Sequence, residues 1–338
     1  MCRKVDATVI CCLVSLLASC DRPADRVSGP AEPEGPALAA MSNTWVAKHT
    51  ISPWRQDAEA TTISGLVYLV GGRKADGRAI ARLDAYDVAT DRWTNLPPMP
   101  GARYQANGAS MVNGKLYLSG GFNSSGSATR SLFVYDPAAR SWSTKANIPN
   151  AGCGGGVQVS IGGMVYSYTG CYDAVHPGGV FFRYDPASNT WLRRAAPPTD
   201  HAGGVGAVIN GKLYLVGGFK PLNCPDHCGG DLDNALHVYH PATNSWTSKA
   251  VCPLKLTGQS AVALGGKLWV VGGTTDFGLL ATLVYDPGTD VWSRKAYLPR
   301  QTTDGAAATV SGKIVYVAGA DDQQPSLPGP SKTYVYTP

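Results

Sequence analysis

The chain has 338 residues, of which 40 are glycine and only 16% are charged, and its formal net charge is +5. This mild positive charge argues against a dedicated nucleic-acid surface. The low charged fraction and the glycine content are typical of a β protein rich in tight turns. An internal repeat runs through most of the chain, which excludes a division into two ordinary domains on length alone.

The first 20 residues are predicted to be a targeting segment. Arg3 and Lys4 give it a positive start, residues 7–18 are mostly apolar, and small residues precede Cys20. Leu17-Ala18-Ser19-Cys20 resembles the bacterial lipobox, whose cysteine becomes the acylated first residue of the mature protein. A plain secretory signal with an incidental cysteine is the alternative. We therefore expect an exported lipoprotein that is attached to the membrane only through a lipid on Cys20.

The next segment, residues 21–43, carries four prolines among Ala, Gly, Glu and Asp residues. A segment of this composition has too little apolar surface to form a core of its own. It is predicted to be a disordered tether.

The most informative feature of the remaining chain is a repeated pair of aromatic residues. A tyrosine is followed seven residues later by a tryptophan at Tyr86/Trp93, Tyr135/Trp142, Tyr184/Trp191, Tyr239/Trp246 and Tyr285/Trp292. A sixth tyrosine, Tyr336, stands close to the last residue, and Trp45-Val-Ala-Lys48 resembles the segment that follows the other tyrosines. A repeat that is cut at the ends and completed from the opposite terminus predicts a closed ring of six units of about 49 residues.

The second unit shows the pattern of one repeat. Its predicted strands are residues 105–112, 115–119, 131–135 and 141–145. Asn113-Gly114 is a strong hairpin signal, and Gly120-Gly121 allows a sharp turn after the second strand. Equivalent hairpin turns stand at Ser64-Gly65, Gly162-Gly163, Asn210-Gly211, Gly265-Gly266 and Ser311-Gly312. Four short antiparallel strands in each unit predict the blades of a propeller.

The glycine pair and the spaced tyrosine and tryptophan resemble the kelch repeat. The resemblance covers residues 44–338 and implies an all-β, six-bladed propeller with four antiparallel strands in each blade. The blades are expected at about residues 55–100, 101–150, 151–199, 200–254, 255–300, and 301–338 together with 44–51. The N-terminal strand then closes the last blade beside residues 331–336, which removes an unpaired sheet edge. We expect the repeated aromatic residues to be structural.

The loops of these blades place polar residues around one mouth of the central channel, which is the default position for a binding site. The predicted ligand-binding face consists of Arg55, Arg103, Tyr104, Asp200, His201, Gln259 and Asp304. Neighbouring positions in the same two sets of loops are Asp57, Phe122, Asn123, Asp173, His176, Lys220, Asp276 and Asp321. The alternative is that these loops are polar only because they meet water.

Two groups of kelch enzymes bear on the function. Galactose oxidase-like proteins hold copper with Tyr and His ligands, whereas the six histidines here are scattered and His237 and His240 are expected at the surface. We therefore expect no metal and no cofactor. Periplasmic sialic acid epimerases are six-bladed kelch proteins, and that resemblance implies a glutamate and arginines at the channel mouth. Glu59, Arg55 and Arg103 would supply these groups if they converge in one pocket.

Five cysteines follow Cys20, and an exported chain favours disulfides. The expected disulfides are Cys153–Cys171 in the third blade and Cys224–Cys228 in a longer loop of the fourth blade. A metal site formed by Cys224, His227 and Cys228 is the alternative, although a lone Cys-x₃-Cys is weak evidence for zinc. If Cys224 and Cys228 form a disulfide, Cys252 is the unpaired thiol, and it is expected to be partly buried behind the loop.

Together these features predict a non-catalytic binding or scaffolding propeller at the bacterial envelope. Its partner is expected to be an envelope protein or a glycan that docks on the channel-mouth loops, and the chain is expected to be a monomer. A sugar-modifying enzyme of the sialic acid epimerase type is the alternative. The longer loop of the fourth blade, residues 222–230, is expected on the functional face, because an insertion in one repeat usually marks that face.

Overall fold

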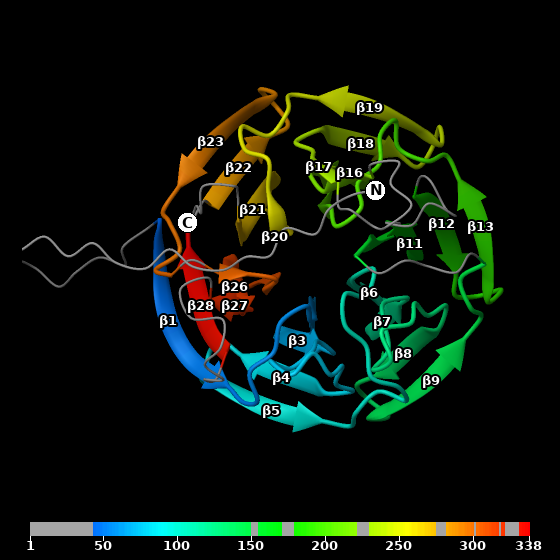
Figure 1. The fold of residues 1–338 in the computed structure, drawn as a ribbon, viewed down its shortest axis with the longest axis vertical. Helices are drawn as coiled ribbons and strands as arrows, with labels where there is room; N and C mark the ends of the chain where they lie inside the picture. The colour runs from blue at the N-terminus through cyan, green and yellow to red at the C-terminus, as the bar shows by residue number, and fades with distance from the viewer. Residues whose placement is uncertain are drawn as a thin grey trace, which may run out of the picture. The chain divides into compact units, whose positions relative to one another are not determined.

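The computed structural model describes residues 43–149, 155–170, 179–221, 230–274, 282–300, 302–317, 319–321 and 331–338. Six four-stranded antiparallel sheets stand around a ring, with the fourth strand of each sheet on the outer rim (Figure 1). Every regular element among these residues is a strand, so none of them belongs to a helix that could cross a membrane. The predicted all-β, six-bladed propeller is confirmed.

The blades follow one another along the chain. The first three contain β2 (Glu59–Ile63), β3 (Leu66–Val70), β4 (Leu83–Asp87) and β5 (Arg92–Leu96); β6 (Ala109–Val112), β7 (Lys115–Ser119), β8 (Leu132–Asp136) and β9 (Ser141–Lys145); and β10 (Val157–Ile161), β11 (Met164–Thr169), β12 (Val180–Asp185) and β13 (Thr190–Arg194). The last three contain β14 (Val205–Ile209), β15 (Lys212–Val216), β18 (Leu236–His240) and β19 (Ser245–Lys249); β20 (Thr257–Leu264), β21 (Lys267–Thr274), β22 (Thr282–Asp286) and β23 (Val291–Lys295); and β25 (Ala306–Val310), β26 (Lys313–Val317), β28 (Ser331–Thr337) and β1 (Thr44–Ile51). Two short pairs are added at the loops: β16 (Phe219–Pro221) with β17 (Gly230–Leu232), and β24 (Thr302–Thr303) with β27 (Ala320–Asp321).

The predicted hairpin turns join the first and second strands of all six blades. Asn113 and Gly114 have φ angles of 50° and 74°, and both central residues of the other five turns also have positive φ. This is the backbone of a type I′ turn, whose twist matches that of the flanking strands. The turn residues therefore fix the register of each hairpin.

The N-terminal strand closes the ring. β1 pairs antiparallel with β28, with Trp45 opposite Tyr336, so the first and the last described strands both belong to the sixth blade (Figure 1). Asn43 Oδ1 accepts hydrogen bonds from the Tyr336 hydroxyl at 2.6 Å and from the backbone N–H of Ala296, in the fifth blade, at 3.1 Å. The indole N–H of Trp45 donates to the Ala296 carbonyl at 3.1 Å. The predicted closure is confirmed.

The repeated aromatic residues join neighbouring blades. The hydroxyl of the buried Tyr86 donates to Asp91 Oδ1 at 2.6 Å, and the same oxygen accepts from the backbone N–H of His49, in the preceding blade, at 2.9 Å. The indole N–H of Trp93 donates to the His49 carbonyl at 3.2 Å. The corresponding bonds elsewhere are Trp142 to Pro97, Trp191 to Ala146, Trp246 to Ala195 and Trp292 to Ala250. Each repeat therefore holds its neighbour, as expected for structural aromatics.

The apolar core lies between adjacent blades. One cluster combines Tyr68 and Leu83 of the first blade with Leu116 and Tyr135 of the second. The loops approach equally closely at Gly71, where an added Cβ would lie 2.6 Å from the Arg103 carbonyl oxygen. Only glycine fits this approach. Because the core is distributed between the blades, the centre of the ring is left open.

Candidate functional site

The first strands of the six blades line a central channel with a volume of about 470 Å³. Its wall consists of residues 57–62, 105–111, 155–160, 203–208, 257–263 and 304–309, most of which have small side chains. Among the described residues that line it, none is basic and three carry carboxyl groups: Asp57, Glu59 and Asp304. We call the end of the channel at which the first strands begin the mouth.

A ring of backbone hydrogen bonds surrounds the mouth. Each blade contributes one residue with positive φ, which lies within the first strand at Gly258 and shortly before it at Asp57, Gln105, Gly155, Gly203 and Asp304. Five hydrogen bonds of 2.7–3.0 Å run from the N–H of one ring residue to the carbonyl of the ring residue in the preceding blade. The ring fixes the backbone of the mouth, so the chemistry of the mouth depends on the side chains that it carries.

Polar and aromatic side chains of the first two blades meet at the mouth. Asp57 Oδ2 forms an ion pair with Arg73 Nε at 2.5 Å, and Asp57 Oδ1 accepts from Gln105 Nε2 at 3.1 Å. The guanidinium carbon of Arg73 lies 5.2 Å from the centre of the Tyr104 ring. Tyr104 stacks on Phe122, with ring centres 5.4 Å apart and planes inclined by 30°. We call these five residues the mouth cluster.

The backbone holds the mouth cluster in a fixed position. Tyr104 and Phe122 exchange both N–H···O bonds, at 3.1 and 2.9 Å, and so do Gln56 and Arg73. The sixth blade has the same kind of pair in Thr303 and Ala320, which are small residues. The fourth blade pairs Ala202 with Phe219, so among these pairs only that of the second blade consists of two aromatic residues.

Glu59 lies in the channel, two residues after Asp57. Burial raises the pKa of its carboxyl group well above the ordinary value, and the neighbouring Asp57 raises it further. Glu59 is thus an acid whose charged form is disfavoured by its surroundings.

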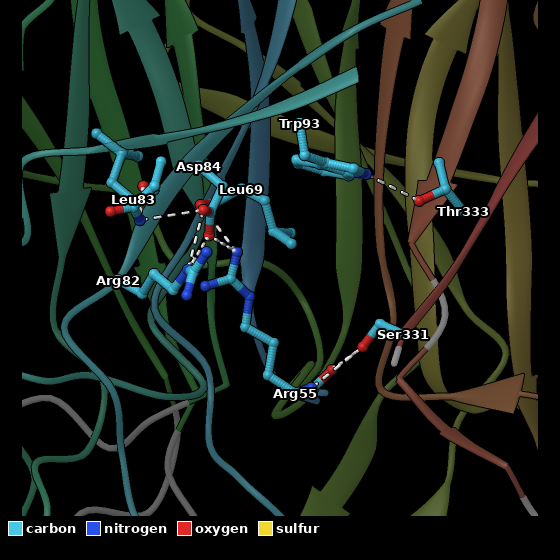
Figure 2. A network of polar contacts seen from close by, with 9 residues as sticks. Arg55, Leu69, Arg82, Leu83, Asp84, Trp93, Ser331 and Thr333 are labelled. Carbon is cyan, nitrogen blue, oxygen red and sulfur yellow. Dashed lines mark hydrogen bonds and ion pairs between the residues drawn. The ribbon is translucent and has the colours of Figure 1, made fainter. Parts of the chain in front are cut away.

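Arg55 lies inside the first blade (Figure 2). Its buried guanidinium Nη2 is 2.6 Å from Asp84 Oδ2, and Asp84 also accepts from Arg82 Nε at 2.8 Å and from Asn95 Nδ2 at 3.2 Å. The backbone N–H of Arg55 donates to the Ser331 hydroxyl, in the sixth blade, at 3.1 Å. Burial lowers the pKa of Arg55 to about 10, although Asp84 opposes this shift. Arg55 therefore links two blades and does not line the channel.

Arg103 has the equivalent place in the second blade. Its guanidinium carbon lies 5.1 Å from the centre of the Phe133 ring, and its Nη2 donates to the Ser131 hydroxyl at 2.8 Å. Burial lowers the pKa of Arg103. Phe133 and the aspartate partner of Arg55 both stand two residues before the repeated tyrosine. Glu59, Arg55 and Arg103 are therefore not brought together in one pocket.

His201 has the same place in the fourth blade, where its partner is His237. Both residues are buried; His201 Nε2 is 2.7 Å from His237 Nδ1, and His201 Nδ1 is 2.7 Å from the Gly217 carbonyl oxygen. The expectation that His237 lies at the surface is wrong, because it occupies the strand face that packs on the loop before the first strand. The sequence contained a signal for this contact, since His237 matches Phe133 in the repeat. Within the described ranges, no group of three or more potential metal ligands is present.

The remaining residues of the predicted face divide between the mouth and the blade loops. Asp200 Oδ1 accepts from the backbone N–H of Gly179 at 2.9 Å. Gln259 is buried beside the channel, and its Oε1 has no hydrogen-bond partner among the described residues. The structure thus brings Tyr104, Gln259 and Asp304 to the mouth. It buries Arg55 and His201 inside the blades, and the half-buried Arg103 contacts Phe133 and Ser131.

The sequence analysis missed Arg73. It follows the glycine pair of the first blade as Phe122 follows that of the second, and this equivalence was the available signal. The lipidation site, residues 21–42 of the predicted tether and both predicted disulfides lie outside the described residues. The predicted residues concerned are Cys20, Cys153, Cys171, Cys224, Cys228, Asp173, His176 and Asp276. Cys252 is buried with a free thiol, and burial raises its pKa to about 11.

The family of the chain follows from comparison with known proteins. The model of the KLHDC2/KLHL20/DRC7 Kelch-repeats domain matches residues 38–218 and 106–320. The chain belongs to the kelch-repeat family. The solved structure of YjhT has a TM-score of 0.67 and covers 84% of this chain and 94% of its own, at 16% sequence identity. At this identity, the similarity to YjhT concerns the fold alone.

Three curated proteins are similar to short parts of the chain. The N-acetylneuraminate epimerase of Pasteurella multocida (strain Pm70) is 39% identical over 71 residues, which is 20% of this chain and 18% of that protein. Beta-scruin of Limulus polyphemus is 33% identical over 69 residues, 20% of this chain and 7% of its own length. The F-box/kelch-repeat protein At1g16250 of Arabidopsis thaliana is 41% identical over 51 residues, 15% of this chain and 13% of its own. The chain thus matches less than a fifth of the length of each relative.

Proposed function

We propose that this kelch propeller is a non-catalytic binding protein of the bacterial envelope, which presents its channel mouth to a glycan or a protein. The observation that carries the proposal is the mouth cluster, a rigid set of aromatic and polar side chains beside an open channel. Rigid groups of this kind around a concavity bind with little loss of conformational entropy. The arginines that an enzyme acting on a sugar acid would use are engaged elsewhere: Arg55 pairs with the buried Asp84, and Arg103 contacts Phe133 and Ser131.

A crosslinking experiment in the native envelope tests this function. A photoreactive amino acid replaces Phe122 at the mouth in one variant and Tyr297, which is 52% exposed and lies outside the mouth cluster, in a control variant. We expect one partner to be captured reproducibly from position 122 and to be absent from position 297. Equal capture at both positions, or capture at neither, would contradict a binding role for the mouth.

The export and anchoring of the protein form part of the same proposal. The sequence of the first 20 residues supports a lipoprotein held at the membrane by an acyl chain on Cys20, and we propose that the chain is a monomer. The Cys20→Ala variant is expected to move from the membrane pellet to the soluble fraction after cell fractionation. Retention of this variant in the pellet would show that the lipid is not the anchor.

A sugar-modifying activity of the sialic acid epimerase type is the second candidate. It is favoured by the 71-residue match to an N-acetylneuraminate epimerase and by the raised pKa of Glu59 in the channel. Proton NMR exchange spectroscopy of N-acetylneuraminate measures how fast its anomers interconvert. Under our proposal the protein leaves this rate unchanged. An acceleration that disappears in Glu59→Gln would establish the enzyme in place of the binding protein.

A further inference from the structure

The aromatic part of the mouth cluster offers an apolar surface to a ligand. Tyr104 and Phe122 are partly exposed, their planes are inclined by 30°, and two backbone hydrogen bonds join them. Rigid aromatic side chains supply contact area at a small entropic cost. The C–H face of a sugar ring is an apolar surface of the corresponding size, so such a stack suits a pyranose.

The polar part of the mouth cluster supplies hydrogen-bonding groups next to the stack. Asp57 and Gln105 lie side by side, with 3.1 Å between Oδ1 and Nε2. A carboxylate accepts from hydroxyl groups, and an amide both donates and accepts. Arg73 contacts both Asp57 and the Tyr104 ring, so a sugar ring placed on the stack would meet these polar groups with its hydroxyls.

The charges at the mouth decide which sugars fit. Arg73 is the cation of the mouth cluster, and its charge is already matched by Asp57 at 2.5 Å. The channel adds the carboxyl group of Asp304, and no basic residue is found among the described residues that line it. A ligand carboxylate would therefore face other carboxyl groups, whereas a neutral sugar would meet no such repulsion.

From this geometry we infer that the mouth cluster is a saccharide subsite that selects neutral sugars against sugars carrying a carboxylate. The inference rests on the proposed binding function and names the ligand class of the same site. Tyr104 and Phe122 stack on the ring, Asp57 and Gln105 bind its hydroxyls, and Arg73 holds Asp57 in place.

Calorimetric titration of the full chain with lactose and with 3′-sialyllactose tests the selectivity. 3′-Sialyllactose is lactose extended by one sugar that carries a carboxylate, so the pair differs in that group. Cellotriose, chitotriose and maltotriose extend the neutral set. We expect at least one neutral saccharide to bind, and lactose to bind more tightly than sialyllactose. Tyr104→Ala should weaken the neutral ligand about tenfold, whereas Tyr104→Phe, which keeps the ring, should stay within about twofold of the parent.

The matched control is Tyr297→Ala, which removes an exposed tyrosine outside the mouth cluster and should leave binding unchanged. Thermal unfolding of each variant establishes that the propeller is intact. Tighter binding of sialyllactose than of lactose would overturn the inference and leave the binding function in place. Absence of binding by every saccharide would also overturn it, and the crosslinking from position 122 would then decide separately whether a protein partner exists.

Discussion

Replacement of Asp84 by leucine is expected to destabilise the propeller strongly, because it leaves Arg55 as a buried cation without a counter-ion. The Asp84 side chain is 1% exposed and accepts from three donors, and the Arg55 side chain is 0% exposed (Figure 2). Arg82 can turn toward solvent when its partner is lost, since its side chain is 33% exposed. Arg55 has no such route.

The magnitude follows from the burial of the pair. Removing one partner of a buried ion pair costs about 3–5 kcal/mol, out of a total unfolding free energy of about 5–15 kcal/mol for a folded protein. At about 2–4 °C per kcal/mol for a large domain, the melting temperature should fall by roughly 10 °C. The double variant Arg55→Leu/Asp84→Leu removes both charges and should recover most of this loss, because apolar replacement of a whole pair is often neutral.

Chemical denaturation of the parent, both single variants and the double variant forms a double-mutant cycle that measures the coupling. A loss below about 1 kcal/mol for Asp84→Leu, or a double variant as unstable as the sum of the single variants, would refute the argument. The folded double variant also separates structure from binding. It should keep the parent affinity for the ligand of the mouth, since Arg55 does not line the channel.

Three further predictions follow from the ionisable groups and from the closure of the ring. Burial raises the pKa of Tyr184 to about 12, so its phenol ionises at a lower pH in the unfolded chain than in the folded one. The stability of the fold should therefore fall as the pH rises above about 10, which thermal unfolding in a pH series would measure. Because the folded state raises the pKa of Glu59, the parent loses stability as the pH rises above the ordinary pKa near 4.5. Glu59→Gln should therefore have a higher melting temperature than the parent at pH 7 but not at pH 4. An equal difference in melting temperature at both pH values would contradict this prediction. Deletion of residues 44–52 removes the closing strand and should lower the melting temperature far more than deletion of residues 21–40, and equal melting temperatures would contradict closure by β1.

The sequence by itself determined the architecture of this protein. The six hairpin turns, the glycine pairs and the tyrosine–tryptophan spacing are local signals, and each acts within a few residues or between adjacent strands. Because the same signals recur in six blades, an atypical residue in one blade does not hide the pattern that the other five show. The closure was predictable for the same reason: Trp45 and Tyr336 are two parts of one repeat that happen to stand at opposite ends of the chain.

The tertiary structure decided which loop residues face the channel. Arg55, Arg103 and His201 are polar loop residues in the sequence, yet their side chains contact Asp84, Phe133 and His237 on the third strands, and Arg55 and His201 are buried there. These partners lie on the third strands, about 30 residues later in the chain. Arg73 reaches the mouth because the ring of backbone bonds places Asp57 beside it. The composition of a loop predicts that its residues are polar. The direction in which each side chain points depends on its partner on a strand that lies further along the chain.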